Sequence, residues 1–230
     1  MCRTIVITSG KGGVGKSSVT INLGYALAHT NKKVCLIDAD FGLKNLDVML
    51  GLENRVIYDL KDVISNKCSL QQILVKDKRM PSLYLLPACK ALSFENLNLD
   101  YMIKVVEQLK KDFDYILIDS PAGIEKGFQY ASGLSKEAIV VVNLDIVSLR
   151  DADRVVGLLL KQGVDQLHML VNKYNETDVF KGRCPSLKEA YDILSIPLIG
   201  IVFDEHDMIE ANNKGIPIYM NKKENLYRCF

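Results

Sequence analysis

A glycine-rich segment close to the start of the chain has the residue types that hold a phosphate. Residues 10–17 follow the spacing G-x-x-x-x-G-K-[ST], directly after a short apolar run and before an amphipathic one. Glycines let successive backbone N–H groups curl around phosphate oxygens, because side chains would hinder those conformations. A glycine-rich turn that matches by accident is the alternative, and the strand–helix context makes an accident rarer. The expected nucleotide ligands are Gly10, Lys11, Gly12, Gly13, Val14, Gly15, Lys16, Ser17 and Ser18.

Two lysines and a serine in this segment can each serve a nucleotide. Lys16 can place its charge on the β- and γ-phosphate oxygens, and Ser17 can offer its hydroxyl to Mg²⁺. The N-terminus of the following helix adds a dipole that favours an anion. One lysine is enough for a phosphate bound to its own chain, so the second, Lys11, can reach outward. A solvated loop lysine is the alternative for Lys11.

Three aspartates follow two of the expected buried strands. Asp119 comes directly after residues 115–118, and Asp38 and Asp40 come after residues 34–37. Ligands of open α/β sheets bind at the carboxyl ends of the strands, where a carboxylate can hold Mg²⁺. Asp38 and Asp40 are two residues apart on extended backbone and so point to the same side. A single aspartate here would merely cap a loop, whereas three beside a phosphate loop favour a metal and phosphate site.

These residues need a sheet whose strands end together. Short β-branched runs alternate with amphipathic stretches, which is typical of a mostly parallel α/β sheet flanked by helices on both faces, the architecture of P-loop NTPases. We expect strands at residues 4–8, 34–37, 83–86, 115–118, 138–142, 167–171 and 198–202. We expect helices at residues 16–29, 101–110, 149–160, 187–194 and 205–213, with Ile103, Val106 and Leu109 as an apolar stripe. No linker divides the chain, so we expect one domain over residues 1–230.

Composition limits the classes of protein to consider. The 230 residues are 48% hydrophobic and 25% charged, which excludes a disordered or fibrous chain. Twenty-nine basic and 28 acidic residues leave a net charge of +1, so we expect no bulk attraction to nucleic acid or anionic lipid. The apolar stretches are too short for a membrane span, and the first leads into the glycine loop and not into a signal peptide. Six scattered cysteines without a C-x-x-C pair favour a reduced, cytoplasmic chain.

Beyond these motifs, the chain resembles the MinD family of septum-site-determining ATPases, a branch of the deviant Walker A (ParA/MinD) ATPases. The phosphate loop with its additional Lys11 is shared by many relatives, whereas residues 42–47 and 53–60 are more specific. The resemblance implies an Mg²⁺-dependent ATPase that dimerises on ATP and acts as a switch in septum placement. The matching stretches are residues 8–17, 38–47, 50–53, 58–60, 85–88, 119–123 and 150–154, with Arg55, Gly215 and Pro217.

The resemblance also implies catalytic and metal-binding roles. Lys16 would bind phosphate, and Lys11 would cross the interface of a homodimer to touch the nucleotide of the other subunit. Asp40 would orient the attacking water, which makes Lys11, Lys16 and Asp40 the implied catalytic residues. Slow hydrolysis would make the protein a timer. The implied metal ligands are Ser17, Asp38 and Asp119.

Further residues are implied in base recognition and in partner binding. Asn172, after residues 167–171, resembles an asparagine that contacts adenine, and Asp204 corresponds to a second adenine contact. Asn45 would lie in the first switch, near the dimer interface. Residues 150–154 match the helix on which a septum inhibitor and a topological-specificity protein dock. No nucleic-acid partner is expected.

Three departures from the family pattern stand out. Lys44 occupies a position that is usually arginine, and Phe203 replaces a proline before Asp204, which weakens the predicted adenine contact there. The sequence ends at Phe230, before the amphipathic helix with which relatives bind the inner face of the membrane reversibly. We therefore expect no targeting tail and a cytoplasmic location. Three apolar residues near this end are expected to pack on the domain, namely Leu226, Tyr227 and Phe230.

Four other functions compete with this interpretation. A flagellar-number ATPase would share residues 42–47 but carry an N-terminal extension, whereas here the loop begins at residue 10. A chromosome- or plasmid-partitioning ATPase would add a basic DNA-binding surface. Metal-cluster proteins of this type need cysteines near the second switch or in C-x-x-C. A structural relative that does not hydrolyse ATP would not need Lys16, Asp40 and Asp119 together.

Overall fold

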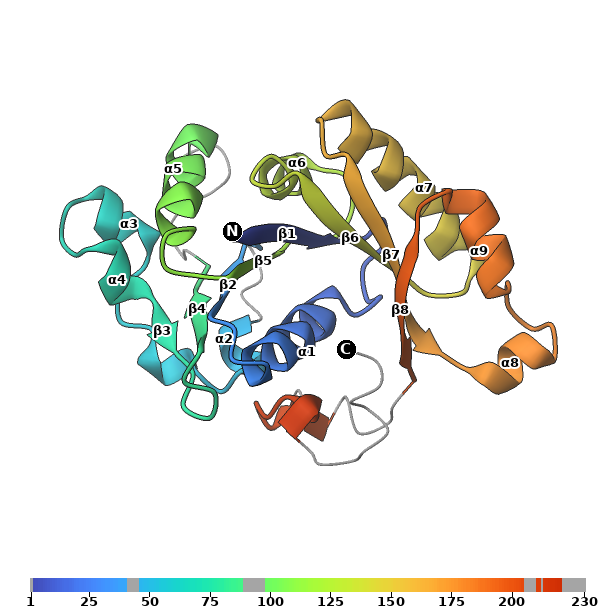
Figure 1. Cartoon of the computed structure of the whole chain (residues 1–230), viewed down its shortest axis with the longest axis horizontal. Coiled ribbons are helices and arrows are strands. Elements are labelled where there is room, and N and C mark those ends of the chain that lie inside the picture. The colour runs from blue at the N-terminus through green and yellow to red at the C-terminus, as the bar shows by residue number, and fades with distance from the viewer. Residues whose placement is uncertain (1, 41–45, 89–97, 205–209, 212, 221–230) are drawn as a thin grey trace.

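The computed structural model describes residues 2–40, 46–88, 98–204, 210–211 and 213–220, and these residues build an eight-stranded sheet (Figure 1). The strands lie in the order β3-β4-β2-β5-β1-β6-β7-β8. Neighbouring strands run parallel except β3 and β4, which pair antiparallel at one edge. The predicted mostly parallel α/β fold is therefore confirmed. The strands are β1 (Arg3–Thr8), β2 (Val34–Asp38), β3 (Val75–Lys76), β4 (Leu83–Leu86), β5 (Tyr115–Asp119), β6 (Glu137–Val142), β7 (Gln166–Tyr174) and β8 (Leu198–Phe203).

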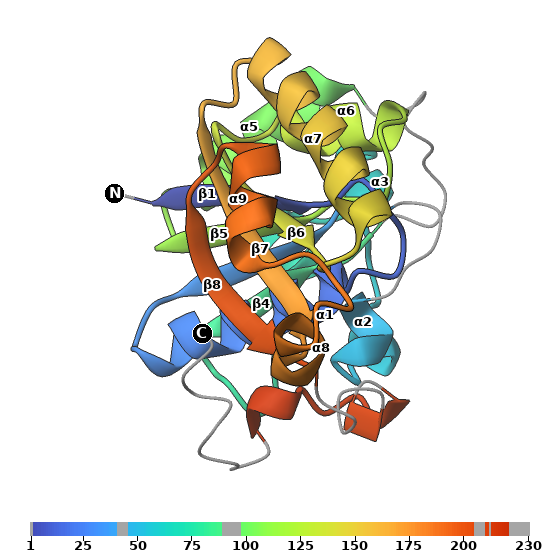
Figure 2. The same ribbon diagram turned by 90° about the vertical axis from the view of Figure 1, so that its right-hand side faces the viewer.

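Helices cover both faces of the sheet, as Figure 1 and Figure 2 show. On one face lie α1 (Lys16–His29) and α2 (Leu46–Met49). On the other face lie α5 (Leu99–Leu109), α6 (Lys126–Ser132), α7 (Ile146–Lys161) and α9 (Leu187–Leu194). The remaining helices are short: α3 (Leu60–Ile64), α4 (Leu70–Ile73), α8 (Glu176–Phe180) and the 3-10 helices η1 (Glu53–Arg55) and η2 (Ile218–Met220).

The central strands are apolar on both sides because each side meets a layer of helices. In β5, Ile116 and Ile118 pack into the core beneath α5, α6 and α7, and Leu117 packs into the core beneath α1. All three side chains are fully buried. Successive side chains of a strand point to opposite faces, so a strand covered on both faces needs apolar residues throughout. This burial explains the uninterrupted apolar runs that predicted the strands.

The register of the central strands brings their carboxyl ends together. In the β2–β5 pair, Asp38 lies directly beside Asp119, and in the β1–β5 pair, Ile7 lies beside Asp119. The loop that follows β1 therefore emerges next to both aspartates. This edge of the sheet is the one at which the predicted site residues must meet.

Each predicted strand is present, and so are the helices predicted at residues 16–29, 101–110, 149–160 and 187–194, with small shifts at their ends. The helix at 187–194 is fixed by a capping box, in which Ser186 and Glu189 bond each other's backbone N–H. The sequence pattern did not predict β3 or the helices α2, α3, α4, α6 and α8, which are too short to show a clear period. Of the helix predicted at 205–213, residues 205–209 and 212 lie outside the described residues, as do Leu226, Tyr227 and Phe230.

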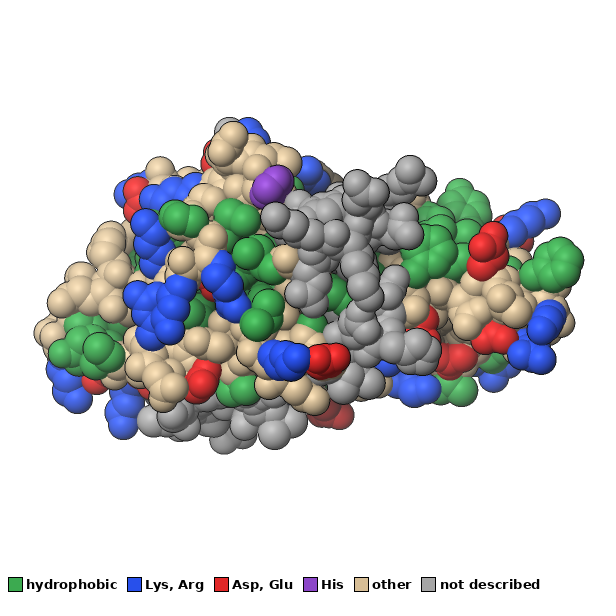
Figure 3. Space-filling view, turned by 90° about the horizontal axis from the view of Figure 1, so that it is seen from below, with side chains coloured by type: hydrophobic (Ala, Val, Ile, Leu, Met, Phe, Trp, Pro, Cys, Tyr) green, Lys and Arg blue, Asp and Glu red, His purple; other side chains and the backbone are tan. Residues whose placement is uncertain are grey.

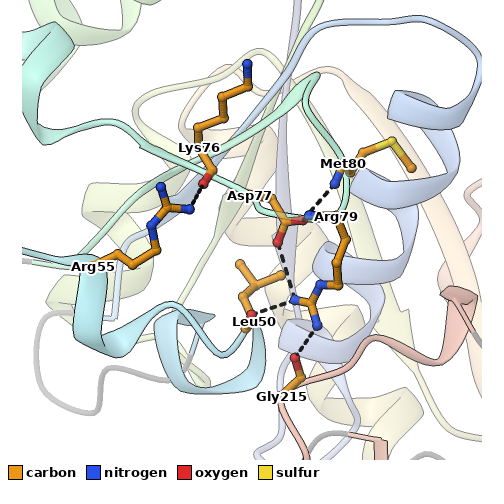
Figure 4. A network of polar contacts seen from close by, with 7 residues as sticks. All are labelled: Leu50, Arg55, Lys76, Asp77, Arg79, Met80 and Gly215. Atoms are coloured by element: carbon orange, nitrogen blue, oxygen red, sulfur yellow. Dashed lines mark hydrogen bonds and ion pairs between the residues drawn. The ribbon is translucent and has the colours of Figure 1, made fainter.

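Arg79, in the turn between β3 and β4, ties α2 to the segment before η2 (Figure 4). Its guanidinium donates to the Leu50 carbonyl at 2.6 Å and to the Gly215 carbonyl at 2.7 Å. It also pairs with the buried Asp77 carboxylate at 3.3 Å. These bonds fix the end of α2, the helix that follows the carboxyl edge of β2.

Side chains of different charge are mixed on the surface, and the cysteines that the structure describes are free. Apolar, basic and acidic side chains share the face seen from below (Figure 3). Cys2, Cys35, Cys68 and Cys184 are free thiols, and Cys35 is fully buried as its apolar strand predicts. Within the described part of the chain, no helix combines the length and the apolar character needed to cross a membrane.

Candidate functional site

The predicted phosphate loop leaves the carboxyl end of β1 and runs directly into α1. Gly15 is the N-cap residue of α1 and has a φ of 98°, in the left-handed region that glycine adopts at little cost. A Cβ at this position would lie 2.2 Å from Nδ2 of Asn172, so only glycine fits. Gly15 has no side chain that could cap α1, and the N–H groups in the first turn of a helix have no partner within the helix. The loop thus offers backbone donors and a helix dipole to an anion.

Side-chain donors hold carbonyl groups of the loop in place. The Ser9 hydroxyl donates to the Lys11 carbonyl at 2.8 Å, and Asn172 Nδ2 donates to the Val14 carbonyl at 2.7 Å. The C=O and N–H of one trans peptide unit point in opposite directions. Fixing the Val14 carbonyl therefore also fixes the direction of the Gly15 N–H.

Lys16 is buried at the start of α1, with its ammonium 3.1 Å from the Ser9 hydroxyl. Burial lowers the pKa of this ammonium, while the nearby carboxylates of Asp119 and Asp40 act in the opposite direction. A buried ammonium is stabilised by an anionic partner. The position therefore fits the predicted contact with a phosphate.

Asp119 is the acceptor for two hydroxyl groups of α1. Ser17 Oγ donates to one carboxylate oxygen at 2.6 Å, and Thr20 Oγ1 donates to the other at 3.2 Å. Burial raises the pKa of Asp119 to about 7; the Ser17 bond opposes the shift, and the charge of Asp38 adds to it. The structure thus joins the predicted residues Ser17 and Asp119.

Several oxygen-bearing side chains lie at this edge and could hold Mg²⁺. Ser17 supplies a hydroxyl, and Asp119 and Asp38 supply two buried carboxylates on adjacent strands. Asp38 also accepts the N–H groups of Asp40 at 3.1 Å and of Leu46 at 3.2 Å, which orders the start of α2. The described residues form no cluster of three or more His, Cys, Asp or Glu that could enclose a metal. This ligand set fits Mg²⁺, which binds through few protein oxygens together with water and phosphate.

Comparison with known proteins decides the family. Residues 2–161 match the family described as AAA domain. The septum site-determining protein MinD of Synechocystis sp. is 49% identical over 223 residues, which cover 97% of this chain and 84% of that protein. A chain of the MinC:MinD cell division protein complex of Aquifex aeolicus is 44% identical and aligns with a TM-score of 0.90 over 98% of this chain and 92% of that chain. The chain belongs to the MinD family.

A second solved structure bears on the nucleotide. The septum site-determining protein MinD of Pyrococcus horikoshii, complexed with Mg-ADP, is 30% identical and aligns with a TM-score of 0.85 over 99% of this chain and 93% of that chain. The MinD family is a family of ATPases, and this chain carries the phosphate loop and acidic edge described above.

Lys11, the additional lysine of the MinD-type loop, faces an acidic residue of its own chain. Its ammonium lies 3.8 Å from a carboxylate oxygen of Asp145, and both side chains are about half exposed. Asp145 caps α7 by accepting the Ser148 N–H at 2.8 Å. An exposed ion pair of this kind contributes at most about 1 kcal/mol. Lys11 can therefore exchange this partner for a stronger one at little cost.

Two arginines of α7 face solvent. Arg150 and Arg154 are exposed, while Ala152 between them is buried against the core. Arg154 lies 4.0 Å from Asp151. A Cβ on Gly10 would lie 2.3 Å from the Asp151 backbone, so α7 also packs against the start of the phosphate loop.

The predicted adenine contacts differ from each other in the structure. Asn172 is buried and bonded to the phosphate loop, as described above. Asp204 has an exposed side chain, and its N–H donates to the Tyr174 carbonyl at 3.0 Å. Lys44 and Asn45 lie outside the described residues. The structure thus brings Asn172, and not Asp204, into bonded contact with the loop.

Three residues at the site were missed by sequence reasoning: Ser9, Thr20 and Lys173. Ser9 precedes the motif, and its bonds to Lys16 and to the loop carbonyl come from the turn itself. Thr20 stands three residues after Ser17, so both hydroxyls lie on one face of α1. This spacing in the sequence could have predicted that Thr20 lies beside Ser17. Lys173, whose ammonium donates to the Gly13 carbonyl, carried no such signal.

Proposed function

We propose that this chain is an ATP-dependent dimerising ATPase that acts as a switch in placing the bacterial division septum, by controlling recruitment of a division inhibitor. The observation that carries the proposal is that Lys16, Ser17 and Asp119 lie together at one edge of the sheet. Ser17 is hydrogen-bonded to Asp119, and the Lys16 ammonium lies near the same carboxylate. The names of the relatives support it, because the Synechocystis protein is a septum site-determining protein and the Aquifex aeolicus chain lies in a MinC:MinD complex.

The site residues suggest how ATP would be bound and hydrolysed. Lys16 and the N–H groups at the start of α1 would hold the β- and γ-phosphates. Mg²⁺, held by Ser17, Asp38 and Asp119, would neutralise charge on the phosphates. Asp40, whose N–H donates to the Asp38 carboxylate at 3.1 Å, would orient a water molecule for in-line attack. Positioning and charge stabilisation dominate this reaction class, which suits residues fixed by a sheet edge.

Dimerisation is the second part of the proposal. Exposed apolar residues follow the carboxyl ends of two central strands, namely Ile124 after β5 and Ile146 and Val147 after β6. Lys11 lies on the same edge and would leave Asp145 for the nucleotide of the other subunit. The chain would act here as one ATPase domain, with the nucleotide at the face where two copies meet. Asn172 would contact the adenine, and Asp204 is the weaker candidate for that role.

Partner binding is the third part. The exposed Arg150 and Arg154 on α7 would bind a septum inhibitor, and a topological-specificity protein would compete for the same helix. Because α7 packs on the start of the phosphate loop, a partner there can sense the nucleotide state.

The proposal is tested by measuring phosphate release from ATP and the mass of the particle in the same samples. We expect hydrolysis with Mg²⁺, none with a chelator, and dimers only with ATP or a non-hydrolysable analogue. Binding of duplex DNA by the ATP-bound dimer at physiological salt would instead favour a partitioning ATPase. Absence of nucleotide binding would refute both.

A further inference from the structure

Strand β7 departs from regular pairing where it reaches the phosphate loop. Val171 pairs with Ile201 and Tyr174 pairs with Phe203, so β7 contains one more residue than β8 over this interval. Within this β-bulge, Lys173 has a φ of 53°, which is uncommon for a residue with a side chain. Bulges beside active sites commonly re-aim a side chain. The bulge thus marks Lys173 as a residue whose direction matters.

The bulge turns two neighbouring side chains toward the loop. Asn172 donates to the Val14 carbonyl at 2.7 Å, and Lys173 donates through its ammonium to the Gly13 carbonyl at 2.9 Å. On a regular strand, adjacent side chains point to opposite faces of the sheet. The extra residue is therefore what allows consecutive side chains of β7 to reach consecutive carbonyls of the loop.

The contact of Lys173 has a geometric consequence for phosphate binding. A carbonyl held by Lys173 fixes the peptide unit that joins Gly13 to Val14, and the N–H of that unit points away from the carbonyl. Asn172 does the same for the next unit. Left-handed backbone at Lys173 costs free energy, and such strain clusters at functional sites.

We propose that Lys173 is a positioning residue for nucleotide binding: its ammonium holds the Gly13 carbonyl so that the Val14 N–H is preset to meet a phosphate. The inference deepens the proposed function and rests on it. Lys173 acts through the loop and touches no reacting atom in this account. A loop that is preset in this way binds substrate and transition state alike, so its loss raises KM and leaves kcat unchanged.

The test uses the full chain and a fluorescent ATP analogue, with Lys173→Met as the main variant. Lys136→Met is the matched control, because Lys136 also donates to a glycine carbonyl, that of Gly163, at 3.2 Å from an exposed position. We expect Lys173→Met to weaken binding and raise KM three- to tenfold with kcat unchanged. Lys173→Arg should restore affinity to within twofold, and Lys136→Met should bind as the wild type does.

A second variant separates the ammonium from the strained backbone. Lys173→Gly removes the charge and relieves the left-handed conformation. We expect it to bind the ATP analogue as weakly as Lys173→Met does, and to unfold at a higher denaturant concentration than Lys173→Met. Wild-type affinity in Lys173→Met, or in Lys173→Gly, would overturn the role of the ammonium. Failure of the wild type itself to bind nucleotide would overturn the proposed function as well.

Discussion

Lys16 is the side chain on which the phosphate site depends most. Its ammonium is buried beside Ser9 and near Asp119, and it is the group that can match a phosphate charge there. We expect Lys16→Ala to lose about 3 kcal/mol or more of nucleotide binding free energy, roughly a hundredfold in Kd, because a buried charge loses its partner. Titration with an ATP analogue checks this. Unchanged affinity would show that the loop is not the nucleotide site, and Lys136→Met serves as the control.

Asp40 is expected to separate binding from hydrolysis. It is half-buried, and its N–H is held by the Asp38 carboxylate. Asp40→Ala should bind ATP and dimerise normally but release phosphate about a hundredfold more slowly, because loss of a group that positions water costs this much. Phosphate release and gel filtration on one sample test both halves. Wild-type turnover would shift the role to another group, with Asp38 the first to examine.

The sequence was sufficient to predict that motif residues such as Ser17 and Asp119 lie together, and it was insufficient for residues that are placed by local geometry. Ser17 and Asp119 were predicted independently as metal ligands, and they are hydrogen-bonded. Lys173 reaches the loop only through a β-bulge, which needs the pairing partner of β7 to be known. The adenine roles of Asn172 and Asp204 stay predictions.

Among the elements, the end of α2 is tied to the segment before η2 by the guanidinium of Arg79. Arg79 bonds Leu50, Gly215 and the buried Asp77, as Figure 4 shows. Arg79→Met should lower the free energy of unfolding by about 3 kcal/mol, since it leaves a buried carboxylate without its charged partner. Urea unfolding monitored by circular dichroism measures this.

Arg55 provides the matched control for this element. It also lies on this side of the sheet and donates to one carbonyl, that of Lys76, at 2.8 Å from an exposed position. Arg55→Met should lower the free energy of unfolding by less than about 1 kcal/mol, because water replaces an exposed bond. Equal losses in the two variants would contradict the account of Arg79.

Element prediction succeeded where burial imposes a pattern along the chain. Strand β5 reads as a continuous apolar run because both of its faces are covered. The stripe predicted for α5 is partly wrong: Ile103 is 37% exposed, whereas Met102 and Val105 are buried with Val106 and Leu109. A spacing of three drifts away from the 3.6-residue period, so one end of the stripe leaves the core.

At the scale of the whole molecule, α7 should carry the partner surface. Arg150→Glu with Arg154→Glu should weaken binding of a division inhibitor at least tenfold and leave ATP turnover unchanged, because both side chains are exposed. Lys161→Glu, at the other end of the same helix, is the control for charge alone. Binding can be followed by fluorescence polarisation with a labelled inhibitor. Equal loss in the control would remove the specific role of this face.

ATP should join two copies of this chain through Lys11, and particle mass measured by light scattering tests this most directly. With a non-hydrolysable ATP analogue and Mg²⁺, the wild type should have twice the 25.8 kDa mass of the chain, and with ADP it should have the mass of one chain. Lys11→Ala should bind the analogue with nearly unchanged affinity and keep the mass of one chain, because its lost contact with Asp145 is weak. A wild type that is saturated with the analogue and remains monomeric, or a Lys11→Ala variant that dimerises like the wild type, would contradict the account.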